Sequence, residues 1–118
     1  MADAGRDDES WRTPGPRGPI SVLVGDRPLL LLGEDVDALV AAIRRSVEIV
    51  GRSLSAGNPL CVRLERLASA LDAAGRSAGS PAVELGPAEQ RLVARVLDDL
   101  AYQRVEPTQG LRILRRLL

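Results

Sequence analysis

Apolar residues recur at helical spacing through most of the chain, and the clearest stretch is 34–55. Its apolar positions would cover roughly 100 degrees of a helix surface, and they are Val36, Leu39, Val40, Ile43, Val47, Val50 and Leu54. Glu34, Asp35 and Asp37 stand in the first turn, where the helix dipole favours negative charge. The pattern therefore predicts an amphipathic helix over residues 34–55.

Three later stretches show the same spacing and predict helices over 59–75, 87–103 and 107–118. The pair Asn58 and Pro59 is typical of a helix start. Asparagine accepts a hydrogen bond from a free backbone N–H of the first turn, and proline suits the first helical position. We therefore expect four helices in all.

Two short apolar runs precede the first helix: ISVLV (20–24) and PLLLL (28–32). Runs of this kind around a Gly-Asp turn predict a β-hairpin over residues 20–32. Pro28 has no N–H for a sheet, so it can lie only at the start of its strand or on an open edge. Because a lone hairpin is marginal in water, this one must pack on the helices or pair with another chain.

The remaining segments predict no regular structure. Residues 1–19 have few aliphatic residues and a PGPRGP run, which predicts a flexible arm with Trp11 as its only anchor. The segment GRSAGSPAVE, residues 75–84, predicts a linker. The fold class is therefore mainly α. We expect a single helical domain over 20–118, with four helices in an orthogonal or bundle-like arrangement, the short hairpin and a disordered N-terminal arm.

Composition supports one domain with an aliphatic core. The chain has 118 residues, of which 45% are hydrophobic, and it contains no Phe, one Trp and one Tyr. No apolar run is long enough to span a bilayer, so no membrane association is expected. A single cysteine and an acidic N-terminus without a signal pattern favour a cytoplasmic protein.

Candidate chemistry is sparse. Histidine is absent, which removes the commonest general base and the nucleophilic pairs that depend on it. Cys61 follows a helix start, where a thiol can become reactive, but it borders the apolar stripe and is interpreted as packed and inert. The acids at 34–37 match no calcium loop and are interpreted as residues favoured by the helix dipole. We expect no catalytic residues, no metal, no cofactor and no small-molecule substrate.

The last predicted helix has two contrasting sides. One side holds the leucines expected to contact a partner: Leu111, Leu114, Leu117 and Leu118. The other holds arginines that could rim this contact or meet nucleic acid: Arg112, Arg115 and Arg116. A short turn joins this helix to the one before it, as in helix-turn-helix DNA readers. The formal net charge of zero argues against a dedicated nucleic-acid binder, although residues 38–118 carry twelve arginines against eight acids.

One stretch, VLVGDRPLLLLGEDVDALVAAIRRSVEIV (22–50), resembles the strand-then-helix opening of small actinobacterial and phage regulators. The resemblance implies a regulatory protein in which a helix-turn-helix follows. It contains no diagnostic functional residue, and the region after Pro87 departs from the winged pattern, so no site residue is transferred.

Two functional hypotheses follow. The leading one is a small non-enzymatic interaction module that oligomerises, most simply as a dimer, or docks on a protein partner. It is motivated by the surplus of amphipathic helix surface and the lack of a catalytic set. The alternative is a DNA-binding transcriptional regulator that uses the C-terminal helical hairpin.

Overall fold

The computed structural model describes residues 17–53, 58–77, 79 and 81–118. In chain order its elements are β1 (Ile20–Val24), β2 (Arg27–Leu31), α2 (Gly33–Ser53), α3 (Pro59–Arg76), β3 (Ala82–Leu85), α4 (Pro87–Tyr102) and α5 (Gln109–Leu117). The described residues thus confirm a mainly α fold with an N-terminal hairpin. The predictions for Trp11 and most of the N-terminal arm lie outside the described residues.

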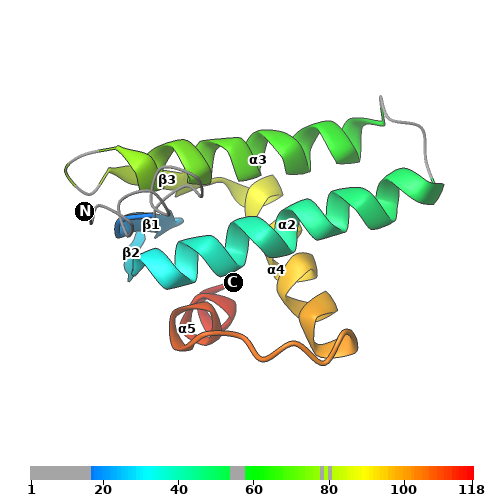
Figure 1. The fold of residues 1–118 in the computed structure, drawn as a ribbon. Helices are drawn as coiled ribbons and strands as arrows, with labels where there is room; N and C mark the ends of the chain where they lie inside the picture. The colour runs from blue at the N-terminus through cyan, green and yellow to red at the C-terminus, as the bar shows by residue number, and fades with distance from the viewer. Residues whose placement is uncertain (1–16, 54–57, 78, 80) are drawn as a thin grey trace, which may run out of the picture.

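The helices α2 and α3 form a long antiparallel pair (Figure 1). The start of α3 is capped as the sequence predicts, because Asn58 Oδ1 accepts a hydrogen bond from the Leu60 N–H at 2.9 Å and Pro59 opens the helix. Their apolar stripes contribute a large part of the core, where residues such as Ile43 and Leu71 are fully buried. The packed pair is the framework on which the other elements sit.

A third strand corrects the prediction of a linker over residues 75–84. Residues Ala82–Leu85 form β3, which pairs parallel with β1, so the strand order is β2-β1-β3. The four-residue stretch AVEL is too short and mixed to show a strand pattern. Its strand conformation depends on hydrogen bonds to β1, about sixty residues earlier in the chain. Pro28 lies on the edge strand β2, as expected.

The sheet stands across one end of the α2–α3 pair, at the left of Figure 1. Its inner face is buried against the helices by Ile20, Val22, Val24, Leu31 and Leu85. The strand register places Leu30, Ser21 and Ala82 in one row on the opposite, outer face. The sheet therefore covers the end of the core with one face and leaves the other face uncovered by any described element.

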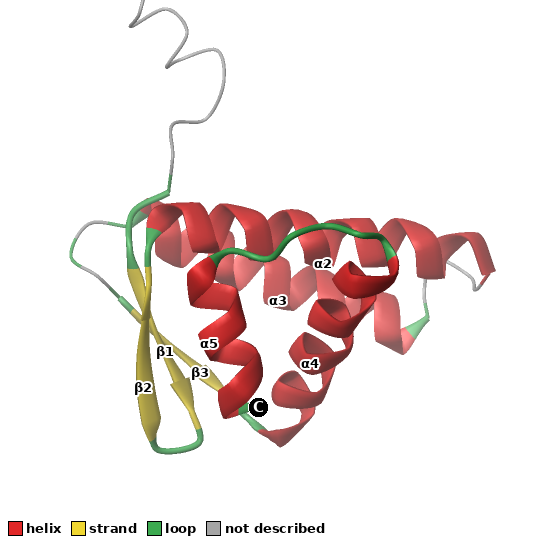
Figure 2. Cartoon of the chain, turned by 90° about the horizontal axis from the view of Figure 1, so that it is seen from below, coloured by secondary structure: helices red, strands yellow, loops and turns green. Residues whose placement is uncertain are grey.

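The helices α4 and α5 cross the α2–α3 pair and lie beside the sheet (Figure 2). Helix α5 begins at Gln109, two residues later than the sequence predicts, because Thr108 is its N-cap and accepts a hydrogen bond from the Leu111 N–H at 3.3 Å. It packs against β2, α2 and α4. No helix in the described ranges is both long enough and apolar enough to cross a membrane.

Candidate interaction surfaces

The leucines predicted to contact a partner lie in or against the core. Leu111 is 1% exposed and Leu114 is 0% exposed, so their side chains are enclosed by the same chain. Leu117 and Leu118 are partly buried and pack on the core cluster. In this fold Leu111 and Leu114 therefore hold α5 onto the molecule, and they leave little surface for the partner contact that the sequence predicts.

A buried carboxylate sets the position of α5. Asp35 is 4% exposed, and its Oδ2 accepts a hydrogen bond from the Leu32 N–H at 2.9 Å. The same carboxylate lies against Gly110 in the first turn of α5, where a Cβ would come within 2.2 Å of Asp35 Oδ2. Of the acids predicted at the start of the first helix, Asp35 thus joins the end of β2 to both α2 and α5.

The arginines of α5 surround a groove between α4 and α5. The groove has a volume of about 320 Å³ and is lined by Leu97, Pro107, Leu111, Arg112, Arg115 and Arg116. Leu97 and Leu111 are buried and form an apolar floor, whereas the arginines are exposed and form the rim. The structure therefore brings together all three arginines that the sequence singles out.

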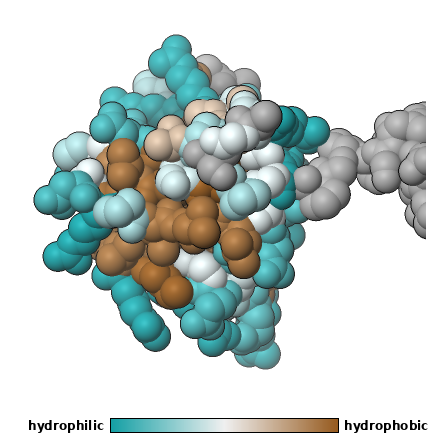
Figure 3. Space-filling view, turned by 90° about the vertical axis from the view of Figure 1, so that its left-hand side faces the viewer, coloured by the Kyte–Doolittle hydropathy of each residue, from teal (hydrophilic) through white to brown (hydrophobic). Residues whose placement is uncertain are grey.

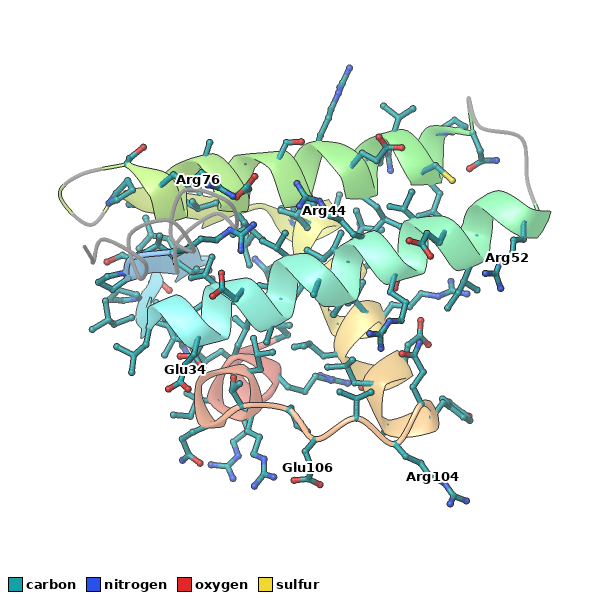
Figure 4. The ribbon with its side chains drawn as sticks, in the orientation of Figure 1. Glu34, Arg44, Arg52, Arg76, Arg104 and Glu106 are labelled. Atoms are coloured by element: carbon teal, nitrogen blue, oxygen red, sulfur yellow. The ribbon has the colours of Figure 1, made fainter. Side chains whose placement is uncertain are left out.

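Two of these arginines have acidic partners. Arg115 Nε and Nη2 donate to the two carboxylate oxygens of Asp98 at 2.8 and 3.3 Å, and this hydrogen bonding raises the pKa of Arg115. Arg112 Nη2 donates to Glu106 Oε2 at 2.6 Å. Figure 4 shows Glu106 on the connection between α4 and α5, pointing away from the body of the molecule. Arg116 has no ion pair within the described part of the chain.

The outer face of the sheet is the surface that the sequence interpretation missed. Leu30 is 57% exposed, and Leu32, which follows β2, is 51% exposed. Figure 3, which views the molecule from the sheet end, shows a broad apolar patch there. The run PLLLL indicated an apolar outer face, because a strand with apolar residues at successive positions is apolar on both faces.

The free edge of β2 is poorly suited to binding another strand. The two-residue turn makes Val24 and Arg27 a hydrogen-bonded pair, so Pro28 and Leu30 direct their backbone groups outward. Pro28 has no N–H, and the Leu32 N–H is already donated to Asp35. The sheet therefore offers a partner its apolar outer face rather than the β2 edge.

An ionic cluster near residue 17 ties the chain leading into β1 to both long helices. Arg17 Nε and Arg76 Nε each donate to Asp72 Oδ1 at 2.7 Å, and Arg17 also pairs with Asp37. The hydrogen bond from Arg76, followed by that from Arg17, lowers the pKa of Asp72 to about 2. Figure 4 shows Arg44 reaching from α2 towards α3, where it approaches the same carboxylate at 3.5 Å.

The single cysteine and the acidic side chains are the other candidates for chemistry. Cys61 is buried at 2% exposure in the stripe of α3 that faces the core. Among residues 17–53, 58–77, 79 and 81–118, no three acidic or cysteine side chains gather as a group that could hold a metal ion. The exposed apolar sheet face and the arginine-rimmed groove are therefore the features of the described surface that most resemble sites of recognition.

Comparison of the chain with models of protein families, with curated proteins and with solved structures finds no match.

Proposed function

We propose that this protein is a small non-enzymatic interaction module that associates with a second copy of itself through the outer face of its sheet. The observation that carries the proposal is the exposure of apolar side chains on the outer face, where Leu30 on the edge strand β2 is 57% exposed. Strands with near-continuous apolar runs are usually covered on both faces, and β1 and β2 have such runs while one face is open. The absence of histidine supports a non-enzymatic role.

The strand register favours a second copy as the covering partner. Across one row of the outer face, a large side chain on β2 adjoins two small ones on β1 and β3: Leu30, Ser21 and Ala82. In a two-fold dimer the same patch of both copies forms the interface. If one residue of the first copy contacts another residue of the second, the same pair also meets with the copies exchanged. Leu30 of one copy would then fit over Ser21 and Ala82 of the other. Two sheets packed in this way lie about 10 Å apart.

The small area of the outer sheet face limits the expected stability of the dimer. Three strands of up to five residues cover about 17 by 14 Å. This area of about 240 Å² is well below the roughly 800 Å² that each partner buries in a standard stable interface. We therefore expect a dimer that forms at high concentration and dissociates on dilution.

Light scattering coupled to size exclusion, run over a wide range of protein concentration, tests the proposal. The wild-type chain should rise from its mass of 12.6 kDa towards twice that value. Leu30→Arg should remain monomeric, because it places a charge within the apolar contact. Ile49→Arg is the matched control, since Ile49 is 47% exposed on α2, and it should associate like wild type. A wild-type monomer at every concentration, or unchanged association of Leu30→Arg, would overturn the proposal.

DNA binding by α4 and α5 is less well supported. The exposed arginines of α5 favour it, but Asp98 and Glu106 stand beside two of them and would repel phosphate groups. The opposite side of α5 is in the core.

A further inference from the structure

We propose that the groove between α4 and α5 binds a short acidic peptide segment that contains one large apolar side chain. This site is separate from the sheet face and does not depend on the self-association proposed above. The groove combines an apolar floor, formed by Leu97, Pro107 and Leu111, with a rim of three guanidinium groups. An occupant therefore needs both an apolar anchor and negative charge.

The rim has free hydrogen-bonding capacity despite its ion pairs. Each guanidinium carries five N–H donors. Arg115 uses Nε and Nη2 on Asp98, Arg112 uses Nη2 on Glu106, and Arg116 has no ion pair among the described residues. Most of the fifteen or so donors thus remain available. Carboxylates match the planar fork of arginine, because both oxygens can accept parallel hydrogen bonds.

The ion pairs within the chain hold the rim arginines in position, and a ligand loses little free energy by displacing them. The Arg115 and Asp98 side chains are 45% and 57% exposed, and those of Arg112 and Glu106 are 50% and 86% exposed. Ion pairs this exposed are worth little, so an incoming carboxylate can share or replace Asp98 or Glu106. The floor is rigid, because Leu111 belongs to the core and Thr108 caps the same helix turn.

The groove favours a peptide over nucleic acid for two reasons. A continuous row of phosphates would meet the carboxylates of Asp98 and Glu106 as well as the arginines. The apolar floor would also remain without a partner, whereas a Leu, Phe or Trp side chain of a peptide could cover it. An amphipathic acidic segment satisfies both the rim and the floor.

A peptide-display selection on the full chain tests the proposal. Random peptides are selected on wild type and counter-selected on Arg116→Glu, a change that disturbs no ion pair seen in the described residues. Enriched peptides should place two or more Asp or Glu residues close to a large apolar residue. Their affinity should fall about tenfold on Arg116→Glu, since one charge-assisted interaction is lost and a repulsion is gained. Binding should also weaken with added salt.

Arg63→Glu is the matched control, because Arg63 is an exposed arginine on α3 outside the groove. It should bind the enriched peptides like wild type, and both variants should keep the wild-type thermal midpoint. Three results would overturn the proposal: no enriched peptide, enriched peptides without the acidic and apolar combination, or equal loss of binding in both variants. Tighter binding of duplex DNA than of any selected peptide, with loss on Arg116→Glu, would also overturn it by assigning the groove to nucleic acid.

Discussion

Gly110 occupies a position with no room for a side chain. It lies in the first turn of α5 beside the buried carboxylate of Asp35, and a Cβ there would approach Asp35 Oδ2 to 2.2 Å. Asp35 cannot retreat freely, because it is enclosed and accepts the hydrogen bond of the Leu32 N–H. A glycine in a helix normally costs stability relative to alanine. Here it is required by close approach between two elements.

Gly110→Ala is therefore expected to destabilise the fold by about 1 to 3 kcal/mol, the usual cost of overpacking. Gly51→Ala, in α2, has the opposite expected sign, because a Cβ there meets nothing within 4 Å. It should stabilise by about 0.5 to 1 kcal/mol through helix propensity alone. Urea unfolding of the two variants measures both values. Stabilisation by both substitutions would show that Asp35 does not restrict this helix turn.

At the scale of elements, the junction of β1, α2 and α3 depends on two glycines and on two carboxylates, Asp72 and Asp37, that both pair with Arg17. Asp72 on α3 receives hydrogen bonds from Arg17 and Arg76. The backbone near residue 17 passes so close to the helices that a Cβ on Gly33 or Gly75 would touch Arg17. The Gly18 N–H also donates to the Gly75 carbonyl at 2.7 Å. This junction fixes the chain where it enters β1 and so helps to set the position of the sheet.

Acid should weaken this junction in a defined range. The pKa of Asp72 is about 2 in the folded state, against 3.8 for an aspartate without these contacts. A folded pKa below the unfolded one stabilises the fold above pH 3.8, and this contribution disappears as the pH falls towards 2. Asp72→Asn should therefore be less stable than wild type by about 1 to 2 kcal/mol at neutral pH.

Urea unfolding of wild type and Asp72→Asn, repeated from neutral pH down to pH 2, follows this difference, which should shrink through the acidic range. Glu65→Gln is the control on the same helix. Glu65 is exposed and has no ion pair in the described residues, so its neutralisation should change stability little. A gap between wild type and Asp72→Asn that stays constant with pH would contradict the role of this carboxylate.

At the scale of the whole molecule, most of the apolar surface is hidden within one copy. The core cluster draws on all three strands and all four described helices, including α5 at the C-terminal end. The exposed large apolar residues lie in three places: Leu30 and Leu32 at the sheet end, Ile49 and Val62 on the long helices, and Tyr102 and Val105 near the end of α4, where Tyr102 is 89% exposed. We expect self-association to involve the sheet, because Leu30 and Leu32 lie close together in the chain on a face that no described element covers, while Leu111 and Leu114 of α5 are buried in the core.

Leu114→Ala separates these roles. Leu114 is fully buried, so its truncation should destabilise the single chain by about 2 to 5 kcal/mol. Ile49→Ala, at a half-exposed position on α2, should cost less than about 1 kcal/mol. Both values come from urea unfolding at a concentration where the protein is monomeric. Weakened association with unchanged monomer stability in Leu114→Ala would instead restore Leu114 as a partner contact.

The sequence by itself determined the hairpin, the four helices and the capped start of α3. These features depend on local causes: hydrophobic spacing, turn residues, and the Asn58 and Pro59 pair. The tertiary structure alone decided that residues 82–85 form a strand, that Leu111 and Leu114 face inward, and that Leu30 faces outward. A periodic pattern shows which side of an element is apolar, but it does not show which neighbour covers that side. That depends on contacts between residues far apart in the chain, such as Asp35 with Gly110 and β1 with β3.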